Sequence, residues 1–69
     1  MNTKIIGERI KELRLENDLS QAKLGEFLQV SQDTISLWEN SKALPTTEYV
    51  IAMCKIFDIS ADYLLGLKD

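Results

Sequence analysis

The segment from residue 32 to residue 37 combines short polar side chains of several kinds with a leucine, and it contains no lysine or arginine. Its amide, carboxylate and hydroxyl groups can donate and accept hydrogen bonds. The rest of the chain offers them no catalytic partner, because it has no histidine and a single cysteine, Cys54. This composition excludes a nucleophile paired with a histidine base, a Cys and His zinc site and an internal disulfide. We therefore expect reversible recognition, and no enzyme activity, metal or cofactor.

These residue types match the groups that base pairs present in the major groove of DNA. Gln32 could form two hydrogen bonds with adenine, and Asp33 could accept one from the cytosine amino group. Thr34 and Ser36 can bond to several bases, and Leu37 could touch the thymine methyl group. The alternative for Gln32 and Asp33 is helix solubility and complementation of the helix dipole. For Leu37 the alternative is an ordinary exposed apolar residue.

Helices must hold this segment, because apolar residues recur every three or four positions and no stretch alternates as a half-buried strand does. Ile6, Ile10 and Leu13 predict a first helix from about residue 5 to residue 17. Asn17 and Asp18 should end it, since both side chains tolerate a left-handed backbone.

Three later helices should start after a serine cap that is flanked by apolar residues at the spacing of a hydrophobic staple. The three sets are Leu19/Ser20/Leu24, Val30/Ser31/Ile35 and Ile59/Ser60/Leu64. These signals predict helices that begin at residues 21, 32 and 61.

A fourth helix in chain order should start after Pro45 with Thr46 as its cap. Its buried residues should be Val50, Met53, Cys54 and Phe57. The 69 residues thus form one all-α domain, 1–69, with five helices.

Only about two or three residues, around Gln29 and Val30, separate the helix that starts at residue 21 from the helix that starts at residue 32, which predicts a helix-turn-helix over residues 21–40. Gly25 lies inside the first of these helices, where glycine costs about 1 kcal/mol against alanine. We expect a close packing contact with a neighbouring helix at this position. Ile35 and Trp38 define the buried side of the second helix. Asp33, Ser36, Leu37 and Asn40 then lie on its outer side.

Polar residues at the helix ends around this outer side could hold the DNA backbone. They are Gln21, Lys23, Asn40, Ser41 and Lys42. Taken one at a time, each is an ordinary polar surface residue.

Glu39 falls near the buried side of its helix and needs a partner, for which Arg14 on the first helix is the natural choice. We therefore predict a structural ion pair between Arg14 and Glu39.

The overall charge argues against simple electrostatic capture of nucleic acid, because the formal net charge is −3 and the isoelectric point is about 4.8. Backbone amides, helix N-termini and amide side chains can still contact phosphates. The N-terminus lacks the apolar run of a signal peptide, and the longest apolar stretch, residues 49–54, is too short to cross a bilayer. A single cysteine suits a reducing cytoplasm, where we expect the protein to act.

The order and spacing of these motifs resemble those of the Cro and phage-repressor (XRE-type) helix-turn-helix family over nearly the whole chain. The matching motifs are R-I-x-x-L-R, L-S-Q-x-x-L, V-S-x-x-T-I-S-x-W-E, a proline before the fourth helix, and D-Y-L-L-G. The resemblance implies a compact five-helix, lambda-repressor-like DNA-binding domain. It also implies a transcriptional repressor that binds a palindromic operator on double-stranded DNA as a homodimer.

The resemblance assigns base contacts to Gln32, Asp33, Thr34 and Leu37, and phosphate contacts to Gln21, Asn40 and Lys42. The Arg14 and Glu39 pair also has its family counterpart. Members often have glycine where this chain has another residue, at turns that need a left-handed backbone. These positions are Asp18, Gln29, Ser41 and Asp58. In addition, this chain lacks the basic residue that many members carry on the recognition helix.

A dimer with half-sites about 34 Å apart would supply the discrimination that one helix lacks. Ile51, Leu65 and Leu67 could form its interface, although they could equally be ordinary surface residues. The alternative function is an XRE-like protein-interaction module, for example of the antitoxin type, in which DNA binding is weak or secondary. The acidic balance of the chain and the absence of lysine and arginine from the outer side of the recognition helix favour that alternative.

Overall fold

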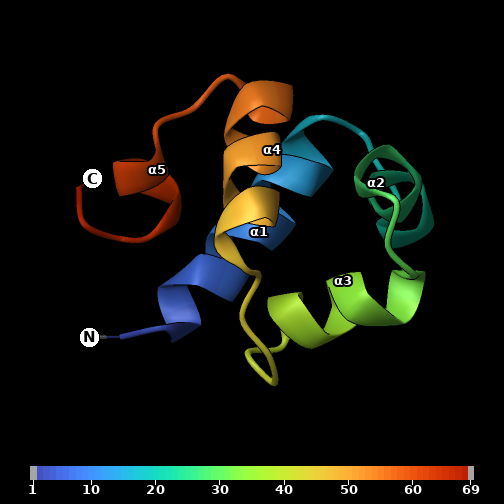
Figure 1. Cartoon of the computed structure of the whole chain (residues 1–69), viewed down its shortest axis with the longest axis horizontal. Helices are drawn as coiled ribbons and strands as arrows, with labels where there is room; N and C mark the ends of the chain where they lie inside the picture. The colour runs from blue at the N-terminus through green and yellow to red at the C-terminus, as the bar shows by residue number, and fades with distance from the viewer. Residues whose placement is uncertain (1, 69) are drawn as a thin grey trace.

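The computed structural model describes residues 2–68, and within that range it contains five helices and no strand. The helices are α1 (Lys4–Glu16), α2 (Gln21–Leu28), α3 (Gln32–Glu39), α4 (Thr47–Phe57) and α5 (Ala61–Leu64). In Figure 1, α1 and α4 cross in the middle of the molecule, α5 lies on one side of them, and α2 and α3 lie on the other. The predicted all-helical fold and its order of elements are confirmed.

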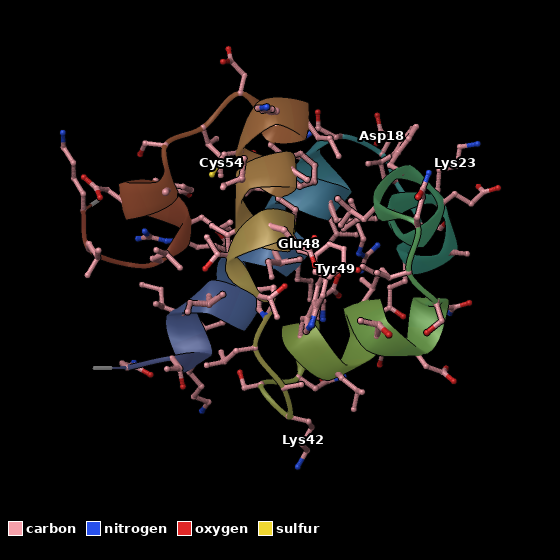
Figure 2. All side chains as sticks on the ribbon, in the orientation of Figure 1. Asp18, Lys23, Lys42, Glu48, Tyr49 and Cys54 are labelled. Carbon is pink, nitrogen blue, oxygen red and sulfur yellow. The ribbon has the colours of Figure 1, made fainter. Side chains whose placement is uncertain are left out.

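The core is formed by the apolar stripes of all five helices, as the spacing predicts. Its buried members are Ile6, Ile10, Leu13, Leu24, Leu28, Ile35, Trp38, Val50, Met53, Phe57 and Leu64. Complete burial of an aliphatic side chain of this size contributes about 1.5–3 kcal/mol. The one expected core residue that stays half-buried is Cys54, which lies on the side of α4 that faces α5 (Figure 2).

The three predicted serine caps are present. The hydroxyl oxygens of Ser20, Ser31 and Ser60 accept hydrogen bonds from the N–H of the residue three positions later, at 3.0–3.1 Å. The staple residues Leu24, Ile35 and Leu64 are fully buried at the same helix starts. The side-chain cap predicted at Thr46 is wrong, because its hydroxyl accepts no such bond. The backbone carbonyl of Thr46 accepts the N–H groups of Tyr49 and Val50, and the carbonyls of the three serines likewise accept N–H groups at their own helices.

The four turn residues for which the sequence predicts a left-handed backbone adopt left-handed angles. Their φ values are 56° at Asp18, 59° at Gln29, 60° at Ser41 and 54° at Asp58. Gln29 and Asp58 directly follow the last residue of a helix, and Asp18 and Ser41 lie one residue further on, so each turn redirects the chain towards the next element.

Two glycines mark the closest approaches of backbone to backbone. A Cβ at Gly25 would lie 2.7 Å from the carbonyl oxygen of Val30, so the neighbour at this position is the turn that leads into α3. The expectation of a crossing helix at Gly25 is therefore wrong. A crossing helix approaches at Gly7 of α1 instead, where a Cβ would lie 2.4 Å from the carbonyl oxygen of Trp38 in α3.

Arg9 of α1 forms hydrogen bonds with the C-terminal part of the described chain. Nη1 of Arg9 donates to the carbonyl oxygens of Tyr63 and Lys68, and the guanidinium carbon lies 4.2 Å from the centre of the Tyr63 ring. This contact holds α5 on the side of α1 opposite to α2 and α3, so it leaves α3 uncovered.

Candidate nucleic-acid interface

Helix α3 is anchored by two side chains that point into the core. Ile35 is fully buried, and Trp38 is 4% exposed. The Trp38 ring lies 5.4 Å from the ring of Tyr49 in α4, at an interplanar angle of 46°. Because α3 also packs against α1 and α2, its orientation is set by three other helices.

The opposite side of α3 faces away from the rest of the molecule and carries the residues predicted to read bases. Figure 1 shows α3 at the lower edge of the domain with no element beyond it. Gln32, Asp33 and Leu37 are exposed, Leu37 by 46%, while Thr34 and Ser36 are half-buried. We call these five residues the outer face of α3. It is a protruding surface with hydrogen-bonding groups and one apolar side chain.

Two hydroxyl groups of the α3 N-terminus are linked to each other. Ser31 Oγ accepts the backbone N–H of Thr34 at 3.1 Å, and it lies 3.0 Å from Thr34 Oγ1. This link orients the Thr34 hydroxyl towards Ser31, whereas the side chains of Gln32 and Asp33 form no hydrogen bond within residues 2–68.

A second link holds the other end of the outer face. Asn40 Nδ2 donates to the carbonyl oxygen of Ser36 at 2.9 Å and to Ser36 Oγ at 3.2 Å. The amide nitrogen of Asn40 is therefore directed back towards α3.

The predicted ion pair between Arg14 and Glu39 is present and buried. Arg14 Nε donates to Glu39 Oε2 at 2.7 Å, and Nη2 donates to Oε1 at 3.1 Å. Arg14 Nη1 also donates to the carbonyl oxygen of Leu19 at 2.8 Å. Within the described residues, no buried side-chain nitrogen or oxygen lacks a hydrogen-bond partner, so the cost of removing both charges from water is offset by good geometry.

The same carboxylate also binds Gln21, a contact that the sequence analysis did not predict. Gln21 Nε2 donates to Glu39 Oε1 at 3.1 Å, and the Gln21 side chain is half-buried. Arg14, Gln21 and Glu39 thus form one network that joins α1, the N-terminus of α2 and the C-terminal end of α3. The polar residue that opens α2 could have suggested this contact, but only the fold brings it to Glu39.

The lysines predicted to meet phosphates lie in different places. Lys42 is exposed in the loop after α3 and points outward beyond that helix (Figure 2), and Ser41 beside it is also exposed. Lys23 lies on the side of α2 that faces away from α3, and its Nζ is 3.4 Å from Glu26. The structure therefore places Ser41 and Lys42 at the edge of the outer face and Lys23 apart from it.

The single thiol lies outside this surface. Partial burial of Cys54 in α4 raises the pKa of its thiol above the usual value, because the charged thiolate would lose its solvation. A raised pKa lowers the thiolate fraction at neutral pH, which agrees with a packing role for Cys54.

Comparison with known proteins identifies the family. The model of the family described as "Helix-turn-helix" matches residues 10–64. Repressor protein C2 of Salmonella phage P22 is 43% identical over 65 residues, which cover 94% of this chain and 30% of the phage protein. The transcriptional activator BcrR of Enterococcus faecalis is 38% identical over 59 residues, which cover 86% of this chain and 29% of the activator.

The chain thus spans less than a third of the length of these two relatives. One similar solved structure is the crystal structure of the P22 c2 repressor in complex with a synthetic operator. It has a TM-score of 0.84 and 40% sequence identity, covering 91% of this chain and 96% of that chain. With a matching family model, a matching fold and two related regulators, the chain belongs to the Cro and phage-repressor (XRE-type) helix-turn-helix family.

Proposed function

We propose that this chain is the sequence-specific DNA-binding domain of a transcriptional repressor, which binds a palindromic operator as a dimer. The observation that carries the proposal is the outer face of α3, which protrudes from the domain while Ile35 and Trp38 fix the helix from within. Similarity to a phage repressor, and to a structure solved with its operator, supports it.

In this proposal the outer face enters the major groove. Gln32 and Asp33 are exposed at the N-terminal end of α3, where an amide and a carboxylate reach base edges most directly. Thr34 and Ser36 supply hydroxyl groups, and Leu37 supplies an apolar contact for a thymine methyl.

Phosphate contacts come from the edges of this surface. Ser41 and Lys42 lie beyond α3, and Gln21 lies at the N-terminus of α2, where backbone N–H groups without helical partners attract anions. Lys23 stays a weaker candidate, because it faces away from α3 and has Glu26 as a partner. The proposed dimer interface uses Ile51 and Leu67, which are 50% and 63% exposed, with the half-buried Leu65.

The proposal includes action in the cytoplasm, without catalysis and without a cofactor. No helix within residues 2–68 has the length and apolar character needed to cross a membrane.

The test is an in vitro selection of duplex DNA from a random pool, performed with the wild-type chain and with Gln32→Ala and Lys42→Ala. The proposal expects a selected motif for the wild-type chain and a changed motif for Gln32→Ala, because Gln32 reads a base. Lys42→Ala should keep the motif and bind all sequences more weakly. Identical motifs and affinities for all three proteins would contradict this assignment.

A second candidate function is a protein-interaction module of the antitoxin type. The net charge of −3 and the absence of lysine and arginine from α3 favour it. Under this alternative the selection yields no enriched motif at low or moderate salt, which separates the two candidates.

A further inference from the structure

The side chains of Ser36 and Asn40 lie one helical turn apart and form a fixed pair. The carboxamide nitrogen of Asn40 has two hydrogens and two acceptors within reach, the carbonyl oxygen of Ser36 at 2.9 Å and Ser36 Oγ at 3.2 Å. The carboxamide nitrogen of Asn40 is therefore directed at Ser36 within the protein. The carboxamide oxygen Oδ1 accepts no hydrogen bond from residues 2–68, and Asn40 is exposed.

This arrangement changes what Asn40 can contact. A phosphate oxygen accepts hydrogen bonds and needs a donor, but the donor group of Asn40, Nδ2, is directed at Ser36. A phosphate contact through Nδ2 would compete with the hydrogen bonds to Ser36, whereas Oδ1 has no partner within residues 2–68. An acceptor at this position instead suits an amino group on a base edge.

The same hydrogen bond also determines whether the Ser36 hydroxyl acts towards DNA as a donor or as an acceptor. Because Ser36 Oγ accepts from Asn40, its own hydrogen points elsewhere, and the hydroxyl donates to no acceptor within the described residues. Ser36 therefore offers a donor and Asn40 offers an acceptor, on two side chains that are joined by a hydrogen bond. A single asparagine amide presents the same two groups when it binds adenine.

We propose, on the basis of the DNA-binding function proposed above, that Ser36 and Asn40 together read one adenine in the major groove. Ser36 O–H donates to adenine N7, and Asn40 Oδ1 accepts from the adenine N6 amino group. Guanine fits poorly, because its N7 and O6 are both acceptors and O6 would face Oδ1. Thymine presents an acceptor and a methyl group, and cytosine presents a donor without an adjacent acceptor. Adenine alone offers the complementary pair.

The experiment uses the duplex selected by the wild-type chain, with single-atom changes at each adenine. Replacement by 7-deazaadenine removes the N7 acceptor, and replacement by purine removes the N6 amino group. At one adenine we expect each change to weaken wild-type binding by about tenfold. Ser36→Ala should become insensitive to 7-deazaadenine at that position, and Asn40→Ala should become insensitive to purine. Lys11→Ala is the control, since Lys11 is exposed on α1 outside the proposed interface and its replacement should keep both sensitivities at this adenine.

Three results would overturn the inference, and one would overturn its basis. If Asn40→Ala weakens all sequences equally, and the loss disappears when one phosphate is replaced by methylphosphonate, Asn40 binds a phosphate. If Asn40→Ala lowers the melting temperature but keeps the purine sensitivity, its role is structural. If no adenine shows both sensitivities, the pair does not read adenine. If the wild-type chain selects no motif at all, the DNA-binding proposal itself fails.

Discussion

The guanidinium group of Arg14 uses all three of its nitrogens on two other parts of the fold. Nε and Nη2 hold the carboxylate of Glu39 in α3, and Nη1 holds the carbonyl oxygen of Leu19 in front of α2. The planar geometry of arginine permits this arrangement, whereas lysine would offer a single nitrogen. Such a buried pair fixes the mutual position of helices more than it adds net stability.

Replacement of Arg14 by alanine should lower the free energy of unfolding by about 3–5 kcal/mol, because Glu39 would stay buried without a counter-charge. Urea denaturation followed by circular dichroism measures this loss. Lys11→Ala is the control, since Lys11 is an exposed residue of the same helix and should change stability little. An Arg14→Ala midpoint within error of the wild type would contradict the structural role.

Replacement of Gln29 or Asp58 by glycine should stabilise the domain by up to about 1 kcal/mol each. Both residues have left-handed backbones, with φ values of 59° and 54°, where a side chain is strained and glycine is not. Thermal denaturation measures the gain. Asn17→Gly is the control, since φ is −98° at this helix end and glycine should lower stability. A lower midpoint for both Gln29→Gly and Asp58→Gly would refute the prediction.

The contact between α1 and α3 depends on Gly7, which leaves room for the last carbonyls of α3. An alanine Cβ there would lie 2.4 Å from the Trp38 oxygen and 2.9 Å from the Glu39 oxygen, both of which belong to backbone. The helix preference of alanine, about 1 kcal/mol, is too small to compensate for displacement of a packed helix. The close packing of α3 against α1, which positions the outer face, therefore requires a residue without a side chain at position 7.

We expect Gly7→Ala to lower the free energy of unfolding by about 1–3 kcal/mol despite its better helix propensity. Urea denaturation tests the loss. Glu8→Ala is the matched control at the next, exposed position and should be close to neutral. A Gly7→Ala protein as stable as the wild type would mean that α3 can move away without cost.

Local signals explain why the helix boundaries could be predicted. Ser20, Ser31 and Ser60 cap with a neighbour three residues away, so the sequence alone contains both partners. Thr46 is also a hydroxyl residue before a helix, yet its hydroxyl makes no cap bond, so the residue type alone does not determine the cap. The roles of Gly7 and Gly25 depend on backbone that approaches from another element or turn, which residue spacing does not reveal.

The candidate site was predictable to the same extent. Periodicity placed Ile35 and Trp38 inward, which determines the outer face of α3. The ion pair of Arg14 and Glu39 could be predicted because the spacing places Glu39 on the buried side of its helix, where a carboxylate needs a partner. The hydrogen bonds of Gln21 and Asn40 did not follow, because each depends on one side-chain rotamer among several that the backbone allows.

At the scale of the whole molecule, the net charge of −3 predicts weak electrostatic attraction to DNA. Lys23 and Lys42 are the only cationic residues among the proposed phosphate contacts, so the proposed dimer would displace few counterions. We expect a plot of log K against log salt with a slope of about −4 or shallower. Fluorescence anisotropy measures the affinity for the selected duplex at several salt concentrations from about 50 to about 200 mM, and these affinities give the slope. A slope near −8 would reveal additional cationic contacts.

The network of Arg14, Gln21 and Glu39 also has a consequence for how the domain opens. Because these side chains tie both helices of the helix-turn-helix to α1, that motif should not unfold as a separate unit. Native-state hydrogen exchange should therefore find the same opening free energy for the amides of Leu24 in α2, Ile35 in α3 and Leu13 in α1. Helices α1, α2 and α3 would then open as a single cooperative unit. A bound partner that slows hydrogen exchange in α3 would therefore slow exchange in α1 to the same extent.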